Sequence, residues 1–134
     1  VDKVINKMNQ LKLEPKNSNI AVLGTTFKEN CPDIRNSKVF DIIAMLKKYG
    51  CNVMVTDPMV DKSLLKKKHN IELTVFNELK NIDVVILCVS HNAYKDIQLN
   101  DWKNVFKENG IFIDIKSLYD ENDFINSKIK YWSL

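Results

Sequence analysis

The hydrophobic pattern of the chain alternates between short apolar runs and segments whose apolar residues recur every three or four positions. The first run, residues 20–23, is β-favouring and ends at Gly24, which is typical of a buried parallel strand. The segment at residues 37–49 has a helical period instead. Its apolar face is formed by Val39, Ile42, Ile43 and Leu46. Strand character returns at residues 52–56, so this part of the chain is predicted to form a β-α-β unit.

The boundaries of this unit carry helix and turn signals. Asn36 or Ser37 is expected to cap the helix, and Gly50 is expected to end it in a left-handed conformation. The Asp-Pro pair at residues 57–58 then breaks the second strand. The loop at residues 25–36 therefore follows the carboxyl end of the first strand, where open α/β sheets bind ligands.

The remaining segments continue the alternation. In chain order they predict a helix at 60–68, a short strand at 71–75, a helical turn at 76–80, a central strand at 84–89, a helix begun by Asn100 or Asp101 and ended by Gly110, a strand at 111–115 and an edge strand at 129–132. We expect an α/β fold, with a Rossmann-like, doubly wound, mostly parallel sheet and helices on both faces. Residues 1–13 have a helical apolar face without an N-terminal cap, so we expect this helix to begin upstream.

The loop at residues 25–36 lacks the glycines with which a dinucleotide-binding turn approaches a pyrophosphate. It carries instead an aromatic ring, Phe27, and two cations, Lys28 and Arg35. In a Rossmann-like strand order, this loop meets the loops that follow two later buried strands, one of which carries Lys116. Three cations and a ring suit a ligand with a base and a diphosphate, bound through side-chain charge.

Composition and charge narrow the classes of function. The 134 residues have about the length of one domain, and the formal charge of +3 is mild. The dense basic run Lys66-Lys67-Lys68 is expected to be a solvated helix end, so no nucleic-acid partner is predicted. No apolar run reaches membrane-spanning length, so we predict no membrane contact and expect a cytoplasmic location. Because the first residue is Val, we expect a piece of a longer chain.

The three cysteines predict neither a disulfide framework nor a metal site, because they are odd in number and form no CxxC pair. Cys51 and Cys88 lie in or beside predicted strands. Cys31 lies on the loop, and nearby cations would lower the pKa of a reactive thiol there. A small residue that packs the loop is the favoured interpretation, and Cys31→Ser would then leave ligand binding intact.

The segment GTTFKENCPDIRNSKVFDII, which begins at Gly24, resembles the C-terminal domain of the UDP-glucose/GDP-mannose dehydrogenase family. The family pattern there is a strand ending in glycine, then Phe-Lys, then a short acidic loop ending in Asp-x-Arg-x-Ser. The matching positions are Gly24, Phe27, Lys28, Asp33, Arg35 and Ser37. The agreement continues through residues 57–58, 84–91 and 113–114. The loop is most similar to the branch that oxidises UDP-N-acetylhexosamines for bacterial surface polysaccharide.

The resemblance implies an NAD-dependent oxidation of the 6-hydroxyl of a UDP-sugar to a carboxylate. It implies a full enzyme, typically a dimer, with an N-terminal NAD-binding domain, a helical connector and a C-terminal UDP-sugar-binding domain. Residues 1–14 would be the end of the connector, and residues 15–134 the UDP-sugar-binding domain. The family's catalytic cysteine and NAD glycines belong to the N-terminal part, and Cys31 does not match the catalytic motif. The fragment alone is therefore expected to be inactive and to contain no catalytic residue.

The same resemblance implies roles for individual residues. Phe27 and Lys28 would contact the nucleotide sugar, and Arg35 would reach the phosphates of NAD. Lys116 is assigned to the substrate as well, although the family usually has Arg there, whose planar fork binds phosphate in a bidentate manner. A place in the core remains an alternative for Phe27.

Simpler roles also remain open for other residues. Arg35 would otherwise pair with Asp33 or Glu29. Asp57 occupies the place of a ribose-binding acid, but without the glycines a turn or capping role is favoured. For His91, a local cap or a hydrogen bond within the loops is favoured over a role in proton transfer.

A second class of function competes with nucleotide binding. A Rossmann-like module without its glycines would serve assembly, as a dimerisation domain or as a regulatory domain that binds a partner. The first class predicts UDP binding that is lost in Lys28→Ala. The second predicts no effect of nucleotides and a mass that depends on concentration.

Overall fold

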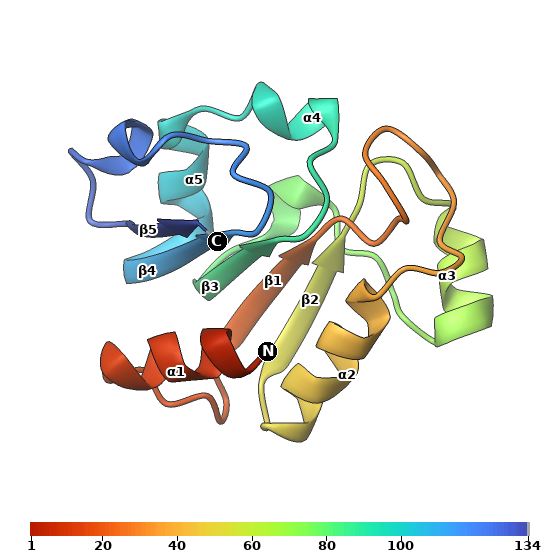
Figure 1. The fold of residues 1–134 in the computed structure, drawn as a ribbon, viewed down its shortest axis with the longest axis horizontal. Helices are drawn as coiled ribbons and strands as arrows, with labels where there is room; N and C mark the ends of the chain where they lie inside the picture. The colour runs from red at the N-terminus through yellow and green to blue at the C-terminus, as the bar shows by residue number, and fades with distance from the viewer. Residues whose placement is uncertain (134) are drawn as a thin grey trace.

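A five-stranded parallel sheet lies at the centre of the computed structural model, which describes residues 1–133 (Figure 1). Its strands are β1 (Asn19–Leu23), β2 (Asn52–Thr56), β3 (Ile82–Leu87), β4 (Phe106–Asp114) and β5 (Lys130–Ser133). Their order in space is β2-β1-β3-β4-β5, and all four neighbouring pairs are parallel. The sheet is thus wholly parallel rather than mostly parallel, and β1 lies beside β3, as the sequence predicts.

Helices cover both faces of the sheet, which confirms the predicted Rossmann-like class. They are α1 (Asp2–Gln10), α2 (Val39–Lys48), α3 (Lys62–His69), α4 (Asn92–Lys95) and α5 (Leu99–Val105), with short 3-10 turns at η1 (Phe76–Glu78) and η2 (Glu121–Phe124). In Figure 1, α1 and α2 lie on one side of the sheet and α5 lies on the other.

The alternation of side chains along each strand divides the core into two layers. In β1, Ile20 and Val22 belong to one layer, and Ala21 and Leu23 belong to the other. The first layer packs against α1 and α2, and the second packs against α5, whose Trp102 is almost fully buried. Because both faces are covered, the strands need continuous apolar runs, which are what the sequence shows.

The helix α1 is part of this packing. Val4, Ile5 and Met8 form its buried stripe and belong to the same core layer as α2. Burying such a stripe contributes about 1.5–3 kcal/mol for each large side chain. The helix is therefore docked on the domain rather than projecting from it.

One predicted helix is too long. The helix expected to end at Gly110 ends at Val105, because residues 106–110 join β4, whose pairing with β3 begins between Phe106 and Ile82. Gly110 is needed for packing instead, since an added Cβ would lie only 2.2 Å from the Phe106 ring. The glycine marks a close approach of a side chain and not the end of a helix.

The predicted strand at residues 71–75 is also wrong. Only Leu73 forms a bridge, with Val55 of β2, and the Thr74 N–H donates to the Val55 carbonyl at 2.8 Å. The chain touches the edge of the sheet there and then leaves it for the turn η1.

Two predicted caps are replaced by neighbouring residues. Gln98 precedes α5 in place of Asn100 or Asp101, and its N–H donates to the Asp101 carboxylate at 2.9 Å. At α2, Lys38 precedes the helix in place of Asn36 or Ser37, and Ser37 Oγ accepts from the Val39 N–H only at 3.4 Å, a weak contact. The starts of these two helices thus differ from the prediction by one to three residues.

Candidate functional site

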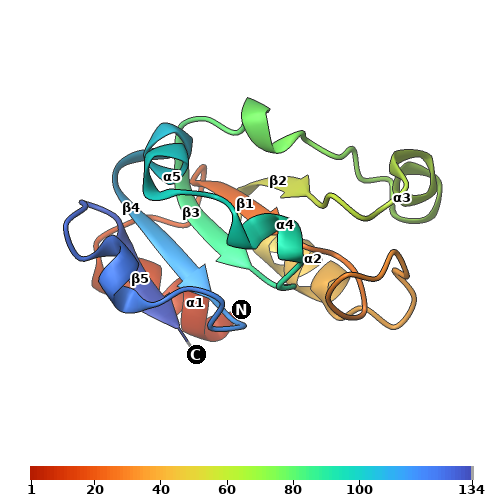
Figure 2. The same ribbon diagram turned by 90° about the horizontal axis from the view of Figure 1, so that it is seen from above.

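The loop after β1 lies beyond the carboxyl ends of β1 and β2, with α4 beside it (Figures 1 and 2). Gly24 begins the loop with a φ of +89°, and its N–H donates to the Thr56 carbonyl of β2 at 3.0 Å. Val89, which follows β3, lies so close that a Cβ added at Gly24 would be 2.6 Å from Val89 Cβ and 2.9 Å from Val89 N. The ends of β1 and β3 therefore meet so closely that only glycine fits.

Three predicted site residues from two distant loops line one hollow of about 320 Å³. Phe27 and Lys28 come from the loop after β1, and Lys116 follows β4. The rest of the lining is Thr26, Asn36, Ser37, Lys38, Val39, Ile42, Cys88, Val89 and Ile115. We call this site the lysine hollow. The Phe27 side chain is 59% exposed, so its alternative place in the core is wrong.

The lysine hollow also contains a cation that the sequence did not suggest. Lys38 lies immediately before α2, and Val39 is the first residue of that helix. Three lysines and the amino end of a ten-residue helix thus face one space, and both features attract anions. The basic residue just before the helical period was the signal in the sequence that would have identified Lys38.

Arg35 does not line the lysine hollow. It forms a bidentate pair with Asp33, with Nε 3.0 Å from Oδ1 and Nη2 2.9 Å from Oδ2, and its side chain is 78% exposed. These hydrogen bonds hold the pKa of Asp33 at about 2. The alternative role of Arg35, a pairing with Asp33, is therefore present, and the guanidinium stays at the surface.

Replacing Arg35 by alanine is expected to raise the pKa of Asp33 from about 2 toward the usual value of 3.8. The cause is the loss of the charged hydrogen bonds that favour the carboxylate. A titration of the carboxyl carbon by NMR measures this shift. Because the pair is exposed, the unfolding midpoint at neutral pH should stay unchanged. An Asp33 pKa that remains near 2 in the variant would show that another group lowers it.

Asp57 is buried at the start of the loop, where its carboxylate accepts several hydrogen bonds. Its carboxylate accepts the Thr25 N–H at 2.7 Å, the Thr25 hydroxyl at 3.1 Å and the Met59 N–H at 2.8 Å, and it lies 3.2 Å from His91 Nε2. Burial by itself raises the pKa of Asp57, but the hydrogen bonds from His91, Thr25 and Met59 outweigh burial and lower it. Asp57 is only 7% exposed, so its role is in the turn, as favoured, and not as an open ribose acid.

His91 is fully buried and makes the favoured loop contact. Its Nδ1 atom accepts the Asn30 N–H at 2.9 Å, and its Nε2 atom lies 3.4 Å from Thr26 Oγ1. Asn30 Oδ1 in turn accepts the Asn92 N–H at 2.8 Å. The loops after β1 and β3 are therefore joined by side-chain contacts that sequence spacing alone could not reveal.

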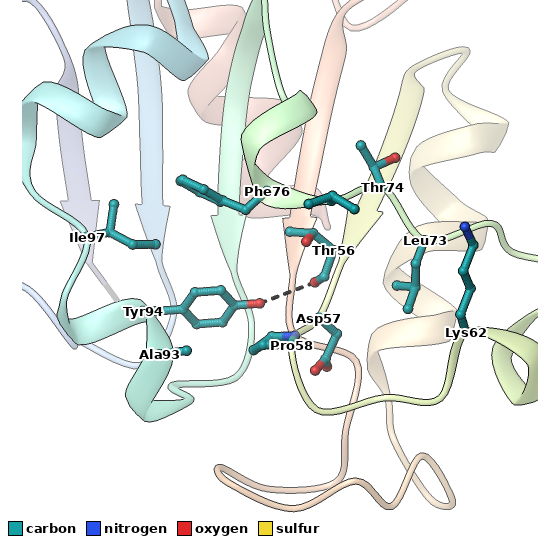
Figure 3. A pocket seen from close by; sticks show the side chains of 11 residues that line it. Thr56, Asp57, Pro58, Lys62, Leu73, Thr74, Phe76, Ala93, Tyr94 and Ile97 are labelled. Carbon is teal, nitrogen blue, oxygen red and sulfur yellow. Dashed lines mark hydrogen bonds between the residues drawn. The ribbon is translucent and has the colours of Figure 1, made fainter.

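A second hollow, of about 420 Å³, lies between the end of β2 and α4 (Figure 3). It is lined by Thr56, Asp57, Pro58, Lys62, Leu73, Thr74, Val75, Phe76, Ala93, Tyr94 and Ile97. Tyr94 OH crosses it to donate to the Thr56 carbonyl at 3.2 Å. This hollow is larger, but Lys62 is the one lysine or arginine in its lining, whereas three lysines line the lysine hollow. The lysine hollow has the charge that a diphosphate needs, so chemistry and not size identifies the candidate site.

Of the three cysteines, Cys51 and Cys88 are buried and Cys31 is half-buried. All three are free, as the absence of a disulfide pattern suggests. Cys88 borders the lysine hollow, and burial raises the pKa of its thiol to about 12, although the charge of Lys116 acts in the opposite direction. A thiol with so high a pKa is inert. Within residues 1–133, the helices are too short or too polar to cross a bilayer.

Comparison with known proteins identifies the family of this chain. The model of the UDP-glucose/GDP-mannose dehydrogenase family, UDP binding domain, matches residues 21–121. Protein CapL of Staphylococcus aureus is 42% identical over 131 residues, which cover 98% of this chain and 30% of that protein. The UDP-N-acetyl-D-glucosamine 6-dehydrogenase of Salmonella typhi is 31% identical over 115 residues, or 86% of this chain and 27% of that protein.

Solved structures show the same fold. The NDP-N-acetyl-D-galactosaminuronic acid dehydrogenase from Methanosarcina mazei Go1 superposes with a TM-score of 0.85 at 23% identity, over 97% of this chain and 27% of that one. The UDP-N-acetyl-mannosamine dehydrogenase Cap5O from Staphylococcus aureus gives 0.72 at 21% identity, over 98% and 29%. The chain thus spans under a third of the length of these relatives. It belongs to the UDP-glucose/GDP-mannose dehydrogenase family, where it matches the UDP-binding domain and groups with the UDP-N-acetylhexosamine dehydrogenases.

Proposed function

We propose that this chain is the nucleotide-sugar-binding domain of an NAD-dependent UDP-sugar 6-dehydrogenase, and that the lysine hollow holds the diphosphate of the substrate. One observation carries the proposal: Phe27, Lys28 and Lys116, assigned from the sequence to the substrate, line the same space. Lysine acts on phosphate as a point charge, and each charge-assisted hydrogen bond contributes about 1.5–3 kcal/mol. The exposed ring of Phe27 offers a flat surface for the base or the sugar.

The chain's own loop does not fit NAD as its main site. No glycine occurs between Gly24 and Gly50, so the backbone of this loop cannot approach a pyrophosphate as a dinucleotide turn does. Asp57, at the usual place of the ribose acid, is buried under the loop. NAD is therefore assigned to a separate N-terminal domain. From this chain, the exposed fork of Arg35 is the group assigned to its phosphates.

The proposed division of labour explains what this domain contributes. Residues 1–14 would be the end of the connector helix, docked through Val4, Ile5 and Met8, and residues 15–134 would hold the substrate. The hydride acceptor and the catalytic cysteine would come from the rest of the enzyme, which we expect to be a homo-oligomer. The similarity to UDP-N-acetyl-D-glucosamine 6-dehydrogenases supports a UDP-N-acetylhexosamine substrate. The proposed role in surface polysaccharide synthesis is what the resemblance of the loop sequence implies.

An NMR titration of this chain with UDP-N-acetylglucosamine tests the proposal. We expect shifts at Phe27, Lys28 and Lys116 with that ligand and with UDP, and much smaller ones with GDP-mannose or NAD. Comparable shifts at the residues that line the second hollow would instead place the nucleotide between the end of β2 and α4. A response to NAD alone would mean that the lysine hollow belongs to the cofactor.

A silent titration would favour the assembly function. In that case the mass of the chain, measured by sedimentation over a range of concentrations, should rise with concentration. A chain that is both silent and monomeric would instead have a site completed by the missing domain, and the titration would be repeated on the full-length enzyme.

A further inference from the structure

His91 joins segments that are distant in the sequence, and its whole ring is buried beneath the loop after β1. Nδ1 accepts the backbone N–H of Asn30 at 2.9 Å, and Nε2 lies 3.2 Å from the carboxylate of Asp57. Nε2 also lies 3.4 Å from Thr26 Oγ1. We call the four residues Thr26, Asn30, Asp57 and His91 the loop clasp.

The hydrogen bonds of the clasp select one form of the imidazole. A ring nitrogen that accepts an N–H carries no proton, so Nδ1 is bare and the single ring proton lies on Nε2. There it faces Asp57, and a carboxylate can only accept. His91 thus links an amide donor to a carboxylate acceptor, and only the neutral Nε2–H form does both.

The clasp holds both ends of the segment that enters the lysine hollow. At one end, the Thr25 N–H and hydroxyl both donate to Asp57. At the other end, Asn30 donates to His91 and accepts the Asn92 N–H at 2.8 Å. The left-handed conformation of Asn30, with φ +57°, suits an asparagine at such a turn.

The residues between these ends, 26–28, are also held by hydrogen bonds. The Thr26 hydroxyl donates to the Lys28 carbonyl at 2.8 Å, which leaves Thr26 Oγ1 free to accept from His91. The Phe27 N–H donates to the Asp33 carbonyl at 2.8 Å. The backbone that carries Phe27 and Lys28 is therefore held by Thr26, which also lines the lysine hollow, and by the Asp33 carbonyl, which does not line it.

We propose that His91 is a positioning residue for the substrate: its neutral, Nε2-protonated ring holds the loop so that Phe27 and Lys28 face the lysine hollow before the ligand arrives. The inference rests on the proposed function. Ordering the loop in advance removes an entropic cost that binding would otherwise carry. Loss of the clasp should therefore weaken binding even though His91 does not touch the ligand.

Two substitutions at His91 separate its hydrogen bonds from its volume. His91→Phe keeps a flat ring but has neither donor nor acceptor, whereas His91→Gln keeps one of each. We expect the Kd of UDP-N-acetylglucosamine, measured by titration calorimetry, to rise about tenfold in His91→Phe, which corresponds to ~1.4 kcal/mol. In His91→Gln it should stay within about threefold of wild type, or ~0.7 kcal/mol.

Tyr94→Phe is the matched control for general loss of stability. It removes another buried hydrogen bond at the same edge, from Tyr94 OH to the Thr56 carbonyl, and keeps both the ring that packs 5.8 Å from the His91 ring and the hydrogen bonds of the clasp. It should lower the unfolding midpoint and leave the Kd unchanged. An equal loss of affinity in Tyr94→Phe and His91→Phe would overturn the positioning role, and so would wild-type affinity in a folded His91→Phe.

The state of the His91 ring can be measured without ligand, so the role of His91 can be tested even if the proposed function fails. Nitrogen NMR of the wild-type imidazole should show a bare Nδ1 and a protonated Nε2, and the Asn30 amide should exchange slowly with solvent. That exchange should be fast in His91→Phe and slow in His91→Gln. A proton on Nδ1 in the wild type would overturn the clasp even if no variant at His91 folded. If the wild-type chain bound no UDP ligand, the proposed function would fail, while this exchange pattern would still support His91 as the residue that holds the loop.

Discussion

The Kd of UDP-N-acetylglucosamine is expected to rise about 10- to 150-fold when Lys28 is replaced by alanine. The reason is the loss of a charge-assisted contact to the diphosphate, for which about 1.5–3 kcal/mol is typical, and each 1.4 kcal/mol is a factor of ten. Lys28 lines the lysine hollow beside Lys38 and Lys116, so its removal leaves two cations in place and weakens rather than abolishes the site. Titration calorimetry on wild-type and variant chains measures the change.

A charge-matched control decides whether the contact or the overall field is responsible. Lys107→Ala removes the same unit of charge, but Lys107 pairs with Asp83 at 3.3 Å, near the amino ends of β3 and β4 and away from the lysine hollow. The Kd of the Lys107→Ala variant for UDP-N-acetylglucosamine should equal that of wild type within a factor of two, because exposed charges that lie far from a ligand are largely screened by salt. Equal losses in Lys28→Ala and Lys107→Ala would mean that net charge, and not the lysine hollow, attracts the nucleotide.

The strands and helices could be predicted because burial imposes a period on the sequence. The run at residues 20–23 is apolar at every position, and both of its faces are covered in the structure. Gly50 ends α2 with φ +84°, as predicted. The same logic failed at Gly110, because a glycine that makes room for the Phe106 ring looks the same in sequence as one that ends a helix.

The candidate site could be predicted only in part. Gly24 and the order of the strands place Phe27, Lys28 and Lys116 at one edge, so a βαβ pattern and a charged loop sufficed to bring them together. The loop clasp could not be predicted, because Asp57 and His91 are 34 positions apart and their contact depends on how the loops pack. Lys38 was missed for a different reason, since a lysine at a helix start ordinarily extends into solvent.

The contacts of Arg35 could not be predicted from the sequence motif alone. The sequence gives both a cation for a phosphate and an acid two residues away, and the structure pairs them at the surface. The pair leaves the guanidinium fork exposed, so contact with a group outside this chain requires that Asp33 be displaced or that both residues meet the partner. A contact between Arg35 and the cofactor would therefore form only in the full enzyme, whereas the lysine hollow is lined by residues of this chain.

Gly24→Ala is expected to destabilise the chain by about 2–6 kcal/mol, a large part of the ~5–15 kcal/mol that holds a domain folded. Part of this cost is backbone strain, about 1–3 kcal/mol for a non-glycine residue at positive φ. The rest is overpacking, about 1–3 kcal/mol, because the new Cβ would lie 2.6 Å from Val89 Cβ and 2.9 Å from Val89 N. Backbone at that distance cannot move aside as a flexible side chain would. Urea unfolding measures the loss.

Gly50→Ala is the matched control, because it separates strain from close approach. Gly50 has nearly the same φ, +84°, but the nearest atom to an added Cβ is Lys16 Cγ at 3.2 Å, on a side chain that can move. This variant should lose only about 1–3 kcal/mol, from strain alone. It lies at the far end of α2 from the lysine hollow and should keep the wild-type Kd, whereas Gly24→Ala displaces the start of the loop that carries Phe27 and Lys28. Equal destabilisation in the two variants would show that strain alone requires glycine at the end of β1, and that the contact with Val89 does not set the position of the loop.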